Sequence, residues 1–475
     1  MRHAHAVAEV RRAEAELAAT LPPGTLMDRA AAGIAAACLQ LLRAERGGAY
    51  GARAVLLVGS GDNGGDALHA GARLARRGVE VRALLLGSRV HEAGRAALEA
   101  AGGRVVEAVA AVDDADLVLD GILGIGGSGG LRPEAARVVR RAEAGGALLV
   151  AVDVPSGVDA DTGEVAGDAV SADVTLVPGT LKPGLLVDPG AGHAGLVQVI
   201  DIGLGAYLRD PVLEVLDAAD VAALLPEPGR ESDKYRRGVV GVVAGSDAFP
   251  GAAVLCTGGA IRAGAGMVRY VGPSRATQHV LSSWPEVVAG EGRVQARVVG
   301  PGVADPRAVA EHVEHPEPVV LDAGCTVLHE RAGGDALLTP HAGELVGLLH
   351  ELGVEVERAE VEARRLHWAG EAARRTGAVV LLKGSTTVVA TPDGRARVNP
   401  TGTSWLATAG SGDVLAGVAG ALLARGLDPY DAGAVAAWLH GLAGRVASQG
   451  APLSAGQLLD ALPEAQRRLA DPPSS

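Results

Sequence analysis

Short apolar runs and amphipathic segments alternate along the whole chain. The apolar runs occupy residues 54–58, 79–86, 117–120 and 147–152 in the first half, and 239–243, 267–271, 318–321 and 378–382 in the second. Runs of this length, rich in valine and leucine, predict strands that are buried on both faces of a parallel sheet. Between them the apolar spacing is helical, as at Leu26, Ile34 and Cys38. We therefore predict an α/β protein with helices on both faces of its sheets.

The alternation breaks between Leu204 and Gly238, where prolines and a charged run replace it. A chain of 475 residues is too long for one ordinary core, and such breaks are typical of domain linkers. We place the boundary near residue 212 and predict two three-layer domains, residues 1–211 and residues 212–475.

Composition narrows the class of protein. A net charge of −13 without a basic patch argues against a nucleic-acid partner. No apolar run reaches the roughly 18 residues of a membrane span, so we expect a soluble, cytoplasmic protein without a membrane partner. Cys38, Cys256 and Cys325 are isolated, which makes a disulfide framework or a zinc site improbable.

A glycine-rich turn at residues 408–413 runs into an apolar helix that we expect from Val414 to Ala424. Backbone N–H groups and the positive end of the helix dipole then converge beside one carboxylate, Asp413. Gly410 and Gly412 permit a close approach or a positive φ, and the spacing is not that of a Walker loop. This pattern predicts a phosphate site with a base in it. The alternative is a capped helix after a flexible turn.

The first predicted strand ends in a glycine-rich stretch, residues 59–66, before a helix that we expect to begin at about Ala67. Such a stretch is weak evidence for nucleotide binding, because many α/β units need glycine there only for a tight turn. Asn63 and Asp66 strengthen it, since they follow the carboxyl end of a strand, where open sheets place ligands.

Two further strands end on carboxylates, Asp120 and Asp153, and the hydroxyl of Ser156 follows the second. Oxygen donors with one or two charges suit a weakly held monovalent or divalent cation. Either carboxylate could instead cap the next helix.

The three loops of the first half resemble the signature loops of the NAD(P)H-hydrate epimerase domain over roughly residues 5–210, which implies a Rossmann-like fold. The resemblance implies that the hydrated nicotinamide nucleotide contacts Asp62, Asn63, Gly64, Gly65, Asp66, Gly124, Ile125, Gly126, Gly127, Ser128, Gly129, Gly130 and Asp153. It also implies a potassium ion held by Asn63, Asp120 and Ser156. Asp153 is the expected acid/base for inverting the carbinol carbon. Lys182 stands where the family also has a lysine, and its alternative role is a solvated loop charge.

The second half resembles the ADP/ATP-dependent NAD(P)H-hydrate dehydratase domain, a ribokinase-like fold, from about Lys234 to Leu423. The resemblance rests on residues 338–344, 383–387 and 407–417, in this order. It implies that the adenine nucleotide binds Lys383, Gly384, Ser385, Thr386, Thr387 and Gly412, and that Ala252, Gly302, His341 and Asp413 line the hydrate site. The alternative for His341 is a residue at a helix start held by local hydrogen bonds.

Together the two resemblances imply an enzyme that repairs hydrated NADH and NADPH (NADHX and NADPHX). One half would interconvert the R and S hydrates, and the other would dehydrate the S form with ADP or ATP and Mg²⁺, with Asp413 as the base. We expect small-molecule partners only, and a homo-oligomer. The alternatives are a ribokinase-like kinase for a small alcohol such as a vitamin precursor, and a first half that is a non-catalytic nucleotide-binding module.

Overall fold

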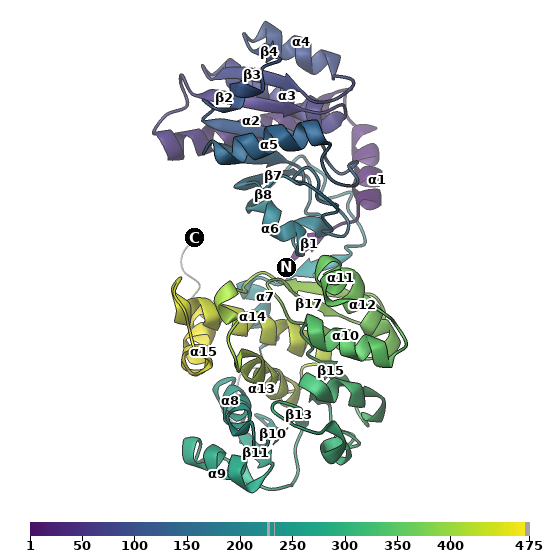
Figure 1. Cartoon of the computed structure of the whole chain (residues 1–475), viewed down its shortest axis with the longest axis vertical. Helices are drawn as coiled ribbons and strands as arrows, with labels where there is room; N and C mark the ends of the chain where they lie inside the picture. Colours follow the sequence, from purple (N-terminus) through teal and green to yellow (C-terminus); the bar gives the residue numbers. More distant parts are fainter. Residues whose placement is uncertain (226–228, 232, 471–475) are drawn as a thin grey trace. The chain divides into compact units, whose positions relative to one another are not determined.

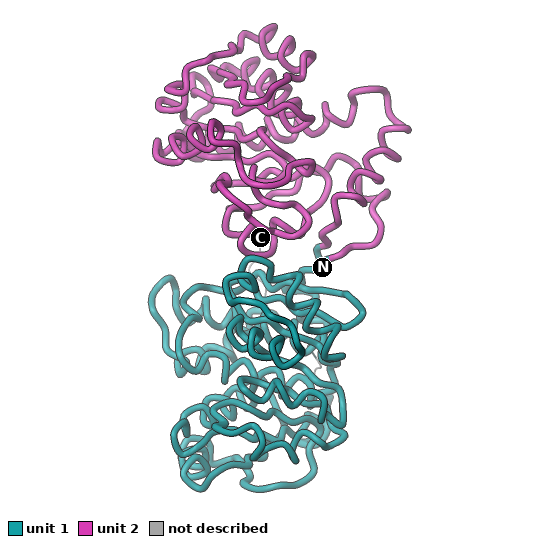
Figure 2. Tube along the Cα trace, turned by 45° about the vertical axis from the view of Figure 1, so that its right-hand side comes forward, with its two compact units in different colours: residues 1–2, 213–475 teal, residues 3–212 magenta. Residues whose placement is uncertain are grey.

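The computed structural model describes residues 1–225, 229–231 and 233–470. It divides into two compact units, His3–Val212 and Leu213–Ser475 together with Met1–Arg2, which Figure 2 draws in separate colours. Part of the predicted linker, residues 226–228 and 232, lies outside the described residues.

The unit His3–Val212 is built on a parallel sheet with the strand order β4-β3-β2-β5-β6-β7-β8. The strands are β2 (Arg53–Val58), β3 (Glu80–Leu85), β4 (Arg104–Val106), β5 (Leu117–Gly121), β6 (Leu148–Val152), β7 (Val174–Pro178) and β8 (Leu196–Ile200). The chain leaves β2 toward β3 and later returns to β2's other side as β5. This reversal opens a crevice at the carboxyl ends of β2 and β5, where open α/β sheets bind ligands.

Helices cover both faces of this sheet because its strands are apolar on both sides (Figure 1). Leu56 and Val58 of β2 pack in one cluster with the helices α2 and α3, whereas Val55 and Leu57 pack in another with α5. The helices are α1 (Val7–Ala18), α2 (Thr25–Arg46), α3 (Asp62–Ala75), α4 (Glu92–Ala100), α5 (Pro133–Ala144) and α6 (Gly190–Ala194). Among the described residues only α2 is long and apolar enough to cross a membrane, and one of its faces packs in the core of this unit.

The unit Leu213–Ser475 contains the sheet order β9-β18-β17-β16-β15-β14-β13-β10-β11-β12. The strands are β9 (Leu213–Val215), β10 (Val239–Val243), β11 (Met267–Val271), β12 (Val288–Ala289), β13 (Ala296–Val299), β14 (Val319–Leu321), β15 (Ala336–Leu338), β16 (Val379–Leu382), β17 (Thr387–Ala390) and β18 (Ala396–Asn399). Pairing is parallel from β12 to β16, and the hairpin β16-β17-β18 is antiparallel.

Helices again lie on both faces of this second sheet (Figure 1). One core cluster joins the sheet to α8, α13 and α14, and α12 packs on β16 and β17 from the other side. The helices are α7 (Ala218–Leu224), α8 (Pro250–Arg262), α9 (Ser274–Ser283), α10 (Ala342–Glu351), α11 (Arg358–Ala363), α12 (Arg365–Thr376), α13 (Ser411–Ala424), α14 (Pro429–Ser448) and α15 (Ala455–Ala470). The α/β class with helices on both faces is therefore confirmed in both units.

The helices α8 and α13 meet along a seam where glycine is required. A Cβ on Gly417 would lie 2.0 Å from the carbonyl oxygen of Cys256, and one on Gly259 would lie 2.4 Å from that of Val414. Real Cβ atoms do not approach a carbonyl oxygen this closely, so the two backbones are in direct contact.

Two helix starts were predicted wrongly. The structure begins α3 at Asp62 and α13 at Ser411, so residues 62–66 and Asp413 belong to first helical turns and not to loops. The reason is close packing. A Cβ on Gly59 would lie 1.8 Å from the carbonyl oxygen of Ile122, and one on Gly64 would lie 2.4 Å from that of Gly59. Glycine brings the helix start against the end of the strand here, and does not mark a flexible turn.

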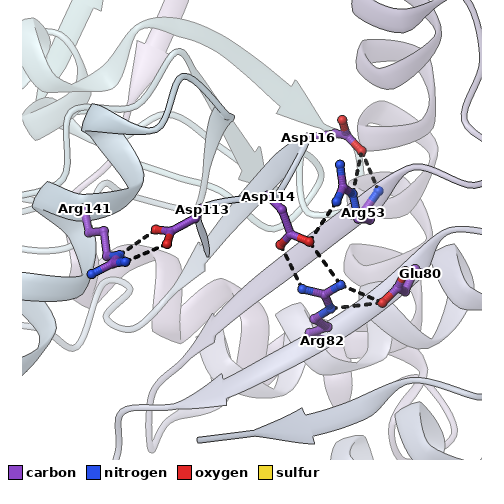
Figure 3. Close-up of polar contacts among 7 residues, drawn as sticks. All are labelled: Arg53, Glu80, Arg82, Asp113, Asp114, Asp116 and Arg141. Carbon is purple, nitrogen blue, oxygen red and sulfur yellow. Dashed lines mark hydrogen bonds and ion pairs between the residues drawn. The ribbon is translucent and has the colours of Figure 1, made fainter. Parts of the chain in front are cut away.

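The amino ends of the strands in the first unit are tied by ion pairs (Figure 3). Asp114 accepts from Arg53 at 2.7 Å and from Arg82 at 2.8 Å, and Arg82 also reaches Glu80 at 2.8 Å. The pairs join β2, β3 and the loop before β5 on the edge opposite the crevice. They help to fix the strands without occupying the end where a ligand would bind.

Candidate active sites

A cavity of about 540 Å³ lies at the carboxyl ends of β2, β5 and β6. Its lining includes the predicted residues Asp62, Asn63, Asp66, Gly124, Ile125, Gly126, Gly127, Ser128, Gly130 and Asp153. The structure thus brings most of the three loops together around one space. Gly64 and Gly65 are instead buried inside α3, and neither they nor Gly129 lines the cavity.

Asp153 is held from two sides. The ammonium of Lys182 donates to Asp153 Oδ1, and the N–H of Ile125 donates to Oδ2 at 3.1 Å. Lys182 is only 1% exposed, so its alternative role as a solvated loop charge is wrong. Asp153 also has φ 71°, a left-handed conformation uncommon for a non-glycine residue. Such strain persists where surrounding contacts enforce it, and here it places the carboxylate that pairs with Lys182 in the lining of the cavity.

Two further carboxyl groups face the same cavity, and both resist ionisation. Burial raises the pKa of Asp66 to about 8, with smaller contributions from Asp153, Asp62 and Glu14. Asp66 Oδ1 is buried and has no hydrogen-bond partner among the described residues. Burial also raises the pKa of Glu14, which projects from α1. The cavity therefore contains a carboxylate paired with Lys182 beside a carboxyl group, Asp66, that can keep a proton near neutral pH.

Asp120, Ser156 and Asn63 meet at the backbone of Leu123. Ser156 Oγ donates to Asp120 Oδ1 at 2.7 Å and receives the N–H of Leu123 at 2.8 Å, while Asn63 Nδ2 donates to the Leu123 carbonyl at 2.8 Å. Burial raises the pKa of Asp120 to about 6. Asp120 does not cap the following helix, whose N-cap is Arg132. This buried carboxylate surrounded by oxygen donors fits the predicted potassium site by donor chemistry.

In the second unit, Asp413 lies in the first turn of α13. Gly410 caps this helix with φ 87°, and a Cβ there would lie 2.4 Å from Leu255 Cδ1. Burial, followed by the charge of Asp322, raises the pKa of Asp413 to about 6. A carboxylate that titrates near neutral pH beside helical N–H groups has the properties of a general base next to an anion site.

Lys383 bridges two acids next to this helix start. Its Nζ lies 2.9 Å from Asp322 Oδ1 and 3.4 Å from Glu344 Oε2. Burial opposes the charge, but the two carboxylates outweigh it and raise the pKa of Lys383. A Cβ on Gly412 would lie 3.2 Å from the same Nζ. Glycine at position 412 therefore lets a permanent positive charge sit against the start of α13.

The other predicted nucleotide residues follow Lys383 in the turn between β16 and β17. Gly384 packs on the buried guanidinium of Arg365, since a Cβ there would lie 2.0 Å from Arg365 Nη2. Arg365 also donates to the Lys383 carbonyl at 2.7 Å. Ser385 and Thr386 complete the turn, and Thr387 is the buried first residue of β17. The sequence did not single out Arg365, because nothing local shows that α12 reaches this turn.

Ala252 and Gly302, both predicted for the hydrate site, are neighbours, since a Cβ on Gly302 would lie 2.5 Å from Ala252 Cβ. His341 is the N-cap of α10, where its Nδ1 accepts the N–H of Glu344 at 3.1 Å. The local hydrogen bonds of the alternative interpretation are thus present. The His341 side chain is nevertheless 57% exposed, so its outer edge stays accessible to a ligand.

The lining of the first unit's cavity also includes residues that the sequence did not indicate, among them Arg11 and Glu14 of α1. Their spacing of three residues places them on one side of a helix. This spacing is visible in the sequence, but it does not show which loop the two side chains face.

Comparisons with known proteins cover both units. A family model described as NAD(P)H-hydrate dehydratase matches residues 240–465, and one described as YjeF-related protein N-terminus matches residues 23–184. A bifunctional NAD(P)H-hydrate repair enzyme of Mycobacterium leprae is 48% identical over 457 residues, with 93% of each chain covered. The enzyme of the same name from Corynebacterium glutamicum is 36% identical, with 99% of each covered.

Among solved structures, an ADP/ATP-dependent NAD(P)H-hydrate dehydratase from Bacillus subtilis, co-crystallised with ATP and Mg²⁺, is 33% identical. It matches with a TM-score of 0.49 over 53% of this chain and 97% of its own. The curated relatives carry the name of the predicted repair enzyme and not that of a vitamin-precursor kinase. By identity and coverage along the whole length, the chain belongs to the family of bifunctional NAD(P)H-hydrate repair enzymes.

Proposed function

We propose that the chain returns damaged, hydrated NADH and NADPH to use through two reactions. The unit His3–Val212 interconverts the R and S hydrates, and the unit Leu213–Ser475 dehydrates the S form at the expense of ADP or ATP. The observation that carries the proposal is the placement of Asp413, a carboxyl group with a pKa of about 6, at the start of α13 beside Lys383.

Dehydration needs a better leaving group than hydroxide. Asp413 accepts the proton of the hydrate's hydroxyl group, and the oxygen forms a bond to the terminal phosphorus of the nucleotide while the bond to AMP or ADP breaks. The N–H groups at the start of α13 and the ammonium of Lys383 stabilise the charge on the transferred group. Phosphate then leaves the hydrated carbon with the electron pair of the carbon–oxygen bond, and the lone pair of the ring nitrogen forms a C=N bond. The neighbouring ring carbon loses a proton, its electron pair forms the C=C bond of NADH or NADPH, and the lone pair returns to the nitrogen.

Epimerisation breaks the ring carbon–nitrogen bond or the carbon–hydroxyl bond at the hydrated carbon and forms it again on the other face, so it needs groups that exchange the proton that lets the ring or the hydroxyl group open and reclose. Asp153 is fixed by Lys182 and Ile125, and Asp66 has a pKa of about 8. A carboxylate and a protonated carboxyl group in one cavity supply a base and an acid together. The predicted residues that line the cavity would bind the nucleotide around this pair.

Two cations accompany the reactions. Potassium would be held by Asn63, Asp120 and Ser156, and its charge would offset the buried carboxylate and order the loop at Leu123. Among the described residues no group of three or more His, Cys, Asp and Glu side chains is arranged to hold a metal. We therefore assign Mg²⁺ to the nucleotide phosphates, as is usual for this ion. The cytoplasmic location and the homo-oligomer expected from the sequence remain predictions.

The test is to mix the protein with Mg²⁺, ADP or ATP and both hydrate epimers, and to follow the absorbance of the reduced nicotinamide. We expect it to return fully, with AMP or ADP and phosphate released in equal amounts. A phosphorylated alcohol that accumulates without recovery of NADH would contradict the proposal and select a kinase. Replacing potassium by lithium should slow epimerisation alone. An epimerisation rate that is the same in both salts would contradict the potassium site.

A further inference from the structure

The cavity of the first unit carries opposite charges in its lining. Its acidic side chains are Glu14, Asp62, Asp66 and Asp153, and its basic side chains are Arg11 and Arg132. Lys182 neutralises Asp153, and burial keeps Asp66 and Glu14 from ionising readily. Three of the four acidic groups are therefore paired or hard to ionise, whereas Asp62 forms no ion pair within the described part of the chain and leaves an unpaired carboxylate in the lining.

The two arginines are not compensated in this way. Both are exposed, and neither guanidinium group makes a hydrogen bond or an ion pair within the part of the chain that the structure describes. A guanidinium without a carboxylate partner at the mouth of a cavity is available for an anionic ligand.

Geometry connects the arginines to the glycine loop. A Cβ on Gly126 would lie 3.3 Å from Arg11 Nη2, so the guanidinium rests against a loop that has no side chain at that point. Arg132 follows the same loop as the N-cap of α5. Arg11 belongs to α1, which lies outside the stretch 23–184 matched by the family model.

We propose that Arg11 and Arg132 form a phosphate clamp that holds the diphosphate of the hydrated dinucleotide at the cavity mouth and so directs its nicotinamide end to Asp153. This inference rests on the proposed epimerase function. The hydrated, reduced ring is uncharged and tolerates the acidic lining, whereas the diphosphate does not. The two charged regions thus select one direction of entry.

The experiment measures epimerisation by the full-length protein without ADP or ATP, so that dehydration cannot run. Pure S hydrate is added, and the R form is followed chromatographically. We expect Arg11→Ala and Arg132→Ala each to raise KM roughly 10- to 100-fold, as for the loss of a charge-assisted hydrogen bond, with kcat little changed. Arg11→Lys should recover part of the loss.

Arg137→Ala is the matched control, because Arg137 is exposed on α5 and does not line the cavity. Its KM should equal that of the wild type. The wild-type KM should also rise with salt, and this dependence should flatten in the Arg11→Ala/Arg132→Ala variant.

An unchanged KM in both arginine variants would overturn the clamp while leaving the epimerase intact. A KM that rises for NADPHX but not for NADHX would also overturn the clamp, because both molecules share the diphosphate and only NADPHX has the additional phosphate. If the wild-type protein does not interconvert the epimers, the proposed function itself fails. Equal melting temperatures for all variants would show that the changes in KM do not come from unfolding.

Discussion

The half-buried carboxyl group of Asp413 should give the dehydration rate its dependence on pH. A base works only when ionised, and burial raises the pKa of Asp413 to about 6. We therefore expect kcat/KM to fall as the pH drops through about 6, well above the usual range of an aspartate. Asp413→Asn should lower the rate by roughly 10²- to 10⁴-fold and remove this acid limb. A limb near pH 4 in the wild type would contradict the assignment.

Asp66 should lower the stability of the folded protein as the pH rises, although epimerisation needs its carboxyl group. Its pKa is about 8 in the folded protein against an ordinary 3.8, so the folded state binds more protons and loses stability as the pH rises from about 4 to about 8. Asp66→Asn removes that penalty. We expect it to stabilise the first unit by roughly 1–3 kcal/mol at pH 8, with little gain at pH 4, while epimerisation slows. Denaturant midpoints at the two pH values measure this, and an equal gain at both would contradict it.

Among elements, the start of α13 is the most sensitive to substitution. Gly410 has φ 87°, and a Cβ there meets Leu255 at 2.4 Å, whereas Gly394 has φ 93° and nothing within 4 Å. Gly410→Ala adds a steric clash to the backbone strain, so it should cost roughly 1–3 kcal/mol more than Gly394→Ala. Dehydration should fall with it while epimerisation continues. Thermal inactivation of the two activities measures both effects, and equal losses in the two variants would contradict them.

The sequence predicted best those elements whose signal is local. Strands such as β2 and β10 are apolar on both faces and were placed within a residue of their observed ends. The starts of α3 and α13 were misplaced, because glycine for close packing and glycine for a turn look alike in a sequence. The hairpin of β17 and β18 was missed, since each strand has only four residues and carries polar side chains, Thr387 in β17 and Arg397 and Asn399 in β18.

In the candidate sites, too, only the residues with a local signal could be placed from the sequence. Asp153 and Asp413 could be named in advance from their places at a strand end and a helix start, whereas most of the residues around them were implied by the resemblance to the two domain families. Lys182, Arg11 and Arg365 could not be assigned, because their roles depend on which distant segment each side chain reaches.

At the scale of the whole molecule, each unit should work from its own site. The described lining of the cavity belongs entirely to His3–Val212, and the cluster around Asp413 belongs to the other unit. With both epimers present, Asp153→Asn should therefore restore the S share of the coenzyme quickly and the rest only at the spontaneous rate of epimerisation. Absorbance of the reduced nicotinamide would show two phases.

Adding the full-length Asp413→Asn protein, whose first unit is intact, should merge the two phases into one. A second phase that persists despite an excess of this protein would mean that the hydrate does not pass freely between chains.

The seam between α8 and α13 limits how the enzyme can acquire new substrates. Ala252 lies on α8 and Asp413 on α13, and the backbone contact at Gly259 and Gly417 excludes even a methyl group. A change from glycine to alanine would meet open space at positions such as Gly347 and Gly370, but it would clash with a backbone carbonyl group at these two. Directed evolution toward other alcohols should therefore keep the two glycines fixed and randomise the surroundings of Ala252 and Gly302 instead.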